Sequence, residues 1–96
     1  MSIVEITVFR LKHEVDALTF LAIDKRVQTE VVPNQPGFLR RTTARRESDW
    51  VVVTLWATEE AAVAFEEVVE GDPVWARFIE AVAPDSFSSH RFDTLD

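Results

Sequence analysis

The hydrophobic and polar positions of the chain change period several times, and each change marks a new element. Residues 3–11 (IVEITVFRL) alternate and are rich in β-branched side chains, which predicts a strand with Val4, Ile6 and Val8 on one face. Residues 16–32 then place apolar side chains three and four positions apart, which predicts an amphipathic helix.

The middle of the chain has the pattern of a β-hairpin. The segment PNQPG at residues 33–37 ends the helix, because proline cannot continue it and glycine permits a tight turn. Residues 38–46 (FLRRTTARR) and 50–56 (WVVVTLW) predict two strands joined by the polar turn ESD. The first of these strands is polar and the second is apolar.

Two helices and a last strand follow the hairpin. Thr58 is a suitable N-cap for the first helix, and Asp72 caps a second, shorter one that begins at Pro73. Residues 86–95 predict a polar final strand. The order β-α-β-β-α-β is that of the ferredoxin-like α+β fold, so residues 1–96 are expected to form a single domain.

The predicted topology has a consequence for assembly. Right-handed crossovers place the first and third strands in the centre of an antiparallel sheet, which agrees with their apolar character. Helices would cover only one face of that sheet. Apolar side chains on the other face need a second cover, and two sheets packed face to face in a symmetric dimer provide it. We therefore expect a homodimer.

Composition narrows the classes of function. A net charge of −7 argues against a duplex nucleic acid partner, and the absence of cysteine excludes disulfide and thiolate chemistry. No secretory signal and no apolar run of membrane-spanning length is found, so we expect a cytoplasmic protein with no membrane partner. The two histidines and scattered carboxylates lack the spacing of a metal site, and no metal is expected.

Four of the ten Lys and Arg residues fall within RRTTARR, residues 40–46. Strand alternation places Arg41, Thr43 and Arg45 on one face. One interpretation is that these side chains protect a sheet edge or pair with helix carboxylates. Another is that one Arg and one Thr turn into a cavity and hold an anionic or enolate oxygen. Arg41 is the preferred candidate for this second role, because its part of the strand should pair with the end of the third strand near Trp56.

The segments QPGFLRR and WVVVTLWATEEAAVAF resemble the dimeric α/β-barrel superfamily, and within it the antibiotic-biosynthesis-monooxygenase-like domains. The resemblance extends over residues 3–95. It implies a pocket between sheet and helices. The superfamily includes cofactor-independent monooxygenases of aromatic polyketides, haem-degrading enzymes and many members without known activity.

Two positions and one region bear on whether the chain resembles the monooxygenases or the haem-degrading enzymes. Trp56 stands where both groups of enzymes carry a functional Trp, although a simple core position is the alternative. Thr7 stands where haem-degrading members usually have Asn, and no histidine lies between residues 58 and 89, the region of their axial ligand. Haem degradation is therefore not expected, and we expect no bound cofactor.

Polar residues of the first helix and last strand complete the candidate site. Asp24 and Gln28 lie four positions apart and share a helix face that borders the expected pocket, whereas Glu66 is interpreted as part of a solvated helix face. His90 could serve as a general base, or make one hydrogen bond at an edge or interface. Trp75 is interpreted as a core residue.

Two functional hypotheses follow from these residues. In the first, the protein is a cofactor-independent monooxygenase of an aromatic or enolisable metabolite. His90 or Asp24 accepts a proton, and the substrate is held by a set of five side chains: Trp56, Arg41, Thr43, Thr7 and Gln28. In the second, the protein is a non-catalytic dimeric ligand-binding or interaction protein. The absence of tyrosine favours the second, because monooxygenases of this type often hold substrate with Tyr hydroxyls.

Overall fold

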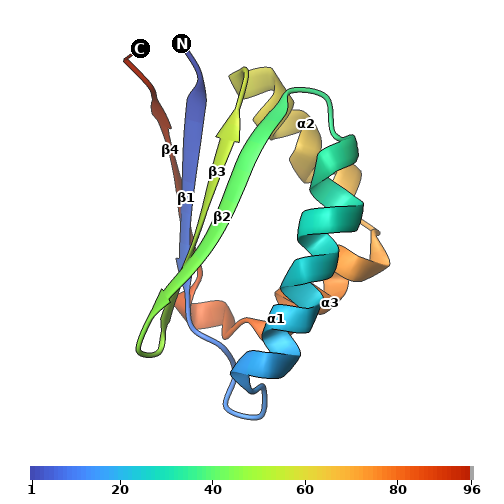
Figure 1. Ribbon diagram of the computed structural model, residues 1–96, viewed down its shortest axis with the longest axis vertical. Coiled ribbons are helices and arrows are strands. Elements are labelled where there is room, and N and C mark those ends of the chain that lie inside the picture. The colour runs from blue at the N-terminus through green and yellow to red at the C-terminus, as the bar shows by residue number, and fades with distance from the viewer. Residues whose placement is uncertain (96) are drawn as a thin grey trace.

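The computed structural model, which describes residues 1–95, is a four-stranded antiparallel sheet with helices on one face (Figure 1). The elements follow the chain in the order β1 (Ile3–Phe9), α1 (Ala17–Arg26), β2 (Phe38–Arg46), β3 (Asp49–Trp56), α2 (Glu59–Val69), α3 (Pro73–Ala81) and β4 (Ser88–Asp93). The strand order is β2-β3-β1-β4, with β1 and β3 in the centre. The predicted ferredoxin-like α+β fold is confirmed. None of the described helices has the length and apolar character needed to cross a membrane.

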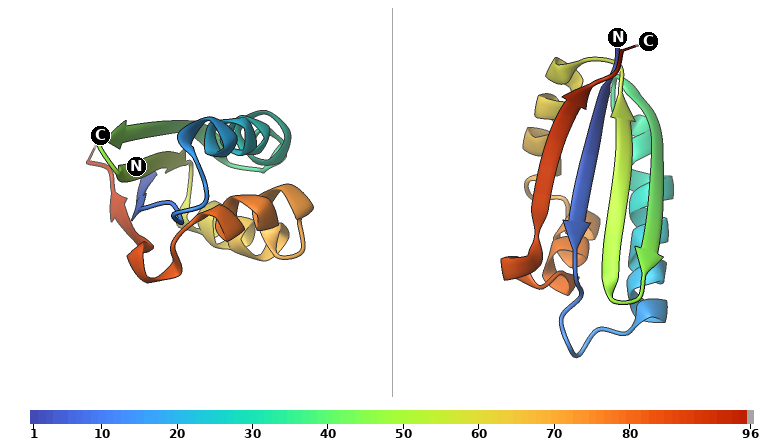
Figure 2. Two further views of the ribbon diagram at one scale, coloured as in Figure 1. Left: turned by 90° about the horizontal axis from the view of Figure 1, so that it is seen from below. Right: turned by 90° about the vertical axis from the view of Figure 1, so that its left-hand side faces the viewer.

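The two faces of the sheet differ in what covers them. Thr7 of β1 lies opposite Val52 of β3 and Ser89 of β4, which fixes the register across three strands. Side chains at Thr7 and at every second position from it face the helices. The alternate positions face the other way, and nothing within residues 1–95 covers that face (Figure 2, right). We call it the outer face of the sheet.

Helix α1 starts as predicted but does not continue as one regular helix. Asp16 is its N-cap and accepts a hydrogen bond of 2.7 Å from the backbone N–H of Thr19. After Arg26 the chain widens into a π-helical turn, Val27–Val31, and then tightens into a 3₁₀ turn, Val32–Asn34. The prediction of a single helix over residues 16–32 was wrong in this respect, because apolar spacing alone does not separate these three helix types.

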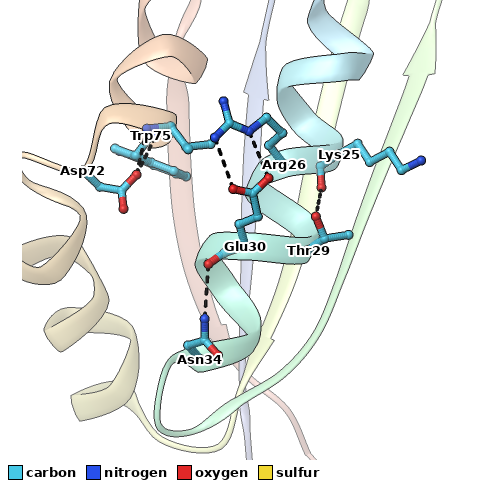
Figure 3. Close-up of polar contacts among 8 residues, drawn as sticks. Lys25, Arg26, Thr29, Glu30, Asn34, Asp72 and Trp75 are labelled. Carbon is cyan, nitrogen blue, oxygen red and sulfur yellow. Dashed lines mark hydrogen bonds and ion pairs between the residues drawn. The ribbon is translucent and has the colours of Figure 1, made fainter.

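Polar contacts on the outside of the π-helical turn span it (Figure 3). Arg26 forms an ion pair of 2.9 Å with Glu30, and the Thr29 hydroxyl donates to the carbonyl of Lys25 at 2.8 Å. The Asn34 amide donates to the carbonyl of Glu30 at 3.2 Å. These contacts are local and solvent-exposed, so they support the irregular segment without drawing on the core.

The sequence also misplaced part of the helix stripe. Leu18 falls within the apolar spacing of residues 16–32, yet 80% of it is exposed. Asp24 instead lies on the sheet-facing side beside Phe20 and Val27, and all three are buried. A carboxylate on the core face of a helix requires a partner there.

The core is a single cluster in which aromatic side chains pack at both ends of β3. Near its start, Phe20 meets Trp50 with ring centroids 4.8 Å apart. At its end, Trp56 packs against Phe38 and Phe65, with centroids 5.9 and 5.1 Å away. A continuous series of ring contacts through α2 and α3 joins these two ends.

Gly37 allows the chain to enter β2 close to α2. Its φ is +81°, and a Cβ built on it would lie 2.5 Å from the Cβ of Ala61. Gly71 has a similar φ of +90° but open space around it.

We expect both Gly→Ala variants to be destabilised by the positive φ, by about 1–3 kcal/mol. Gly37→Ala should lose more stability than Gly71→Ala, because α2 must move to make room for the new Cβ. Urea unfolding of both variants measures the difference, and equal losses would contradict it.

Candidate functional site

A cavity of about 270 Å³ lies between the sheet and the helices. Its volume is just below the usual range of small-molecule sites, about 300–1,000 Å³. The sheet contributes polar side chains from all four strands and the helices contribute mostly apolar and aromatic ones. The principal lining residues are Glu5, Thr7, Arg41, Val52, Thr54 and Ser89 from the sheet, and Phe65, Glu66, Val69, Trp75 and Phe78 from the helices.

Arg41 is the most buried charged side chain of this cavity. Only 2% of its side chain is exposed, and its Nη2 lies 2.7 Å from Oδ1 of Asp24, whose side chain is 10% exposed. Nη1 of Arg41 donates to the Gln28 side chain at 3.1 Å and, more weakly, to the Thr43 hydroxyl at 3.4 Å. The structure thus brings together two pairs of residues that the sequence put forward on separate elements.

The contacts of Asp24 and Arg41 define their roles. Asp24 was considered as a proton acceptor, but here it holds the guanidinium of Arg41 against the floor of the cavity. The guanidinium carbon also lies 5.7 Å from the ring centroid of Phe78, at cation–π distance. Arg41 is therefore a fixed hydrogen-bond donor whose charge is compensated within the protein.

The arginines of β2 divide between the two faces of the sheet. Arg45, like Arg41, lies on the helix side, where it stacks on Trp50 at 5.2 Å, but it does not line this cavity. Arg40 and Arg46 are exposed, and Arg40 pairs in register with Leu55 of the outer face. Edge protection remains a suitable interpretation for these exposed residues, but not for the buried Arg41.

A second polar cluster borders the opposite side of the cavity. Arg91 of β4 donates from Nε to Glu5 of β1 at 2.9 Å and from Nη2 to Glu66 of α2. Burial by itself lowers the pKa of the Arg91 guanidinium, but the hydrogen bond and charge of Glu5, together with Glu66, outweigh burial and raise the pKa above its ordinary value. Beside them, the hydroxyls of Thr7 and Ser89 lie 2.9 Å apart.

Sequence reasoning missed this cluster. Glu66 is solvent-exposed, as expected, but it also lines the cavity, and Glu5 and Arg91 were not considered. One signal was present in the sequence: Glu5 is a charged residue in a central strand, where burial of a charge requires a partner. Its partner lies 86 positions away, and it becomes apparent only when the register of β1 and β4 is known.

Of the two interpretations of Trp56, the structure supports the core position, whereas Trp75, which was expected in the core, lines the cavity. Trp56 is fully buried between Phe38 and Phe65 and is not part of the cavity wall, which begins at the preceding inward residue, Thr54. Trp75, interpreted as core, lines the cavity and is held by Asp72, which caps α3 and accepts from the Trp75 backbone N–H at 3.0 Å (Figure 3). Trp56 therefore acts as a core residue beside the site.

His90 lies on the outer face of the sheet. It pairs in register with Ile6, its side chain is exposed, and it is separated from Asp24 by the sheet itself. The structure therefore does not bring these two proposed proton acceptors into one cavity. Neither His90 nor His13 lines it. Among residues 1–95, no group of three or more His, Cys, Asp or Glu is arranged to hold a metal ion.

Comparison with known proteins relates the chain to others through its structure. No family model matches the sequence, and no match is found among curated proteins. The structure is similar to a mutant form of SnoaB, a cofactor-independent oxygenase from Streptomyces nogalater, with a TM-score of 0.81 over 99% of this chain and 94% of that one, at 15% identity. It has the fold of the antibiotic-biosynthesis-monooxygenase-like proteins.

Two further structures show the range of proteins with this fold. A protein from Caulobacter crescentus, proposed to be an antibiotic biosynthesis monooxygenase, matches with a TM-score of 0.79 over 99% of this chain and 91% of that one, at 18% identity. A mutant form of MhuD, with two manganese protoporphyrin IX molecules per active site, matches with a TM-score of 0.63 over 97% and 94%, at 21% identity. At these identities the likeness establishes the fold and leaves the reaction open, so the absence of haem binding stays a prediction.

Proposed function

We propose that the cavity binds a small, flat and largely apolar metabolite, and that the protein is a cofactor-independent monooxygenase of an aromatic or enolisable compound. The observation that carries the proposal is a cavity with aromatic walls and an immobilised donor, Arg41, on its floor. Thr7 and Thr54 add hydroxyls to the same floor. A fixed guanidinium stabilises an oxygen that gains negative charge as the substrate loses a proton.

One observation favours a second function, non-catalytic binding of the same class of ligand. Asp24 is paired with Arg41, and Glu5 and Glu66 are paired with Arg91. Every carboxylate in or behind the described cavity wall is therefore already engaged by an arginine. A ligand would have to displace one of these pairs before a carboxylate could accept its proton.

Binding and oxygen uptake separate these two functions. The probes are 2-tetralone, an enolisable bicyclic ketone, and 2-naphthol, each titrated by calorimetry and then incubated in an oxygen-electrode cell. Thr7→Val, which removes a cavity hydroxyl, is expected to weaken binding about fivefold, by loss of one hydrogen bond. Thr42→Val is the matched control, because Thr42 lies opposite Val53 on the outer face.

Each result of this experiment has a defined meaning. Binding with oxygen consumption and incorporation of ¹⁸O₂ into the product supports the monooxygenase. Binding without oxygen uptake supports the non-catalytic function. Failure of both probes to bind, or equal effects of the two Thr→Val variants, would contradict a ligand site in this cavity.

We also propose that the protein is a homodimer joined through the outer face of the sheet. That face carries a set of apolar side chains: Val4, Ile6, Val8, Val51, Val53, Leu55 and Phe92. Val8 and Phe92 are 42% and 53% exposed in the single chain. An apolar patch across a whole sheet favours a symmetric partner of the same chemistry.

Light scattering at micromolar concentration is expected to give twice the 11.0 kDa mass of the chain. Val53→Lys places a charge in the middle of the outer face and is expected to shift the mass to that of a monomer. Val68→Lys is the control, because Val68 is 56% exposed on α2 and lies away from that face. A monomer mass for the unmodified protein would refute the dimer.

A further inference from the structure

The charged groups around the cavity do not balance. On one side, Arg41 is neutralised by Asp24. On the other, Arg91 is shared between Glu5 and Glu66. Two arginines therefore face three carboxylates, which leaves an excess of one negative charge.

The excess lies on one side of the cavity. Arg41 belongs to β2 and Arg91 to β4, which are the two opposite edges of the sheet. Glu5 and Glu66 line the cavity, whereas Arg91 stands behind them. Their side chains are 18% and 63% exposed, so Glu5 is the more shielded from solvent and Glu66 is at the rim. A ligand in the cavity thus has a neutralised guanidinium at one end and surplus carboxylate charge at the other.

The wall that connects the two ends is aromatic. Trp75 stacks on Phe78 with centroids 5.1 Å apart and an interplanar angle of 16°, and Phe65 meets Trp75 edge-on at 5.4 Å. All three line the cavity. Aromatic faces attract organic cations, most strongly where water is partly excluded. The aromatic wall and the carboxylates therefore both favour a positively charged ligand.

We infer that Glu5 and Glu66 set the specificity of this cavity, and that they select a small aromatic ligand with an ammonium or hydroxyl group over one with a carboxylate. The inference rests on the proposed ligand-binding function. It differs from the expectation that an arginine here holds an anionic ligand, because Asp24 already compensates the charge of Arg41. The enolisable oxygen of the proposed substrate would lie at the Arg41 end, and its donor group at the Glu5 end.

Three probes with the same ring system test the inference by calorimetry: 2-naphthylmethylamine, 2-naphthylmethanol and 2-naphthoate at pH 7. The ammonium probe is expected to bind at least about tenfold more tightly than the carboxylate, which is about 1.4 kcal/mol, with the alcohol between them. Added salt should reduce the ratio, because the rim is open to solvent.

Glu66→Gln removes the surplus charge and is expected to reduce that ratio to about threefold or less. Glu67→Gln is the matched control: Glu67 is the next residue of α2, makes the same change in net charge, and does not line the cavity. Both variants should retain the melting temperature of the unmodified protein, since both positions are exposed.

Failure of this inference differs from failure of the proposed function. If the probes bind but carboxylate and ammonium affinities are equal, or if the two Glu→Gln variants change the ratio alike, the charge selection is refuted and ligand binding stands. If none of the three probes binds, the ligand-binding function itself is refuted, and the inference with it.

Discussion

Replacing Asp24 by Asn is expected to lower the free energy of unfolding by about 3–5 kcal/mol, because it leaves the guanidinium of Arg41 buried without a counter-ion. The side chains of Arg41 and Asp24 are only 2% and 10% exposed, so water cannot take over the lost interaction. Gln28 and Thr43 would still accept hydrogen bonds from Arg41, but neither carries charge. Urea unfolding followed by tryptophan fluorescence measures the loss.

The double variant Asp24→Leu, Arg41→Met separates the effect of removing the ion pair from the effect of leaving one buried charge unpaired. Replacement of both members of a buried ion pair by apolar side chains of similar size is often close to neutral, so most of the lost stability should return. Arg26→Gln is the control, since the Arg26–Glu30 pair is about half exposed and contributes little. A loss below about 1 kcal/mol for Asp24→Asn would show that the pair is solvated and that Arg41 is not a fixed feature of the cavity.

The fold was predictable because its signals are local. The alternation in β1 and β3, the breaking segment PNQPG and the caps Thr58 and Asp72 each specify their own element, and together they define one topology. The π-helical turn after Arg26 was not predictable in this way. Its apolar side chains have a spacing that suits a regular helix equally well.

The site was only partly predictable because its residues meet through register. Asp24, Gln28, Arg41 and Thr43 could be named from their positions on a helix face and a strand face, but their mutual contacts could not. A shift of one residue in β2 would have turned Arg41 to the outer face. The alignment of β1 with β4 is determined only by the folded sheet.

Trp56→Ala is expected to have an effect as large as that of Asp24→Asn, about 3–5 kcal/mol, because it removes a fully buried indole from the core. Trp56 packs against Phe38 on β2 and Phe65 on α2, so its loss separates the sheet from the helix at that end. That is a large share of the stability of a small domain, about 5–15 kcal/mol. The melting temperature and urea midpoint measure it.

Trp56→Phe distinguishes packing from the polar part of the indole. The Nε1 of Trp56 is buried and has no hydrogen-bond partner among residues 1–95. Phenylalanine keeps most of the apolar area and removes this unsatisfied donor, so the variant should lose less than about 1.5 kcal/mol. Trp75→Ala is the comparison, because Trp75 is only partly buried and lines the cavity. Its loss should reduce the free energy of 2-naphthol binding by more than it reduces the free energy of unfolding. If Trp56→Phe were as unstable as Trp56→Ala, removal of the indole N–H would itself be costly, which would show that this group has a hydrogen-bond partner.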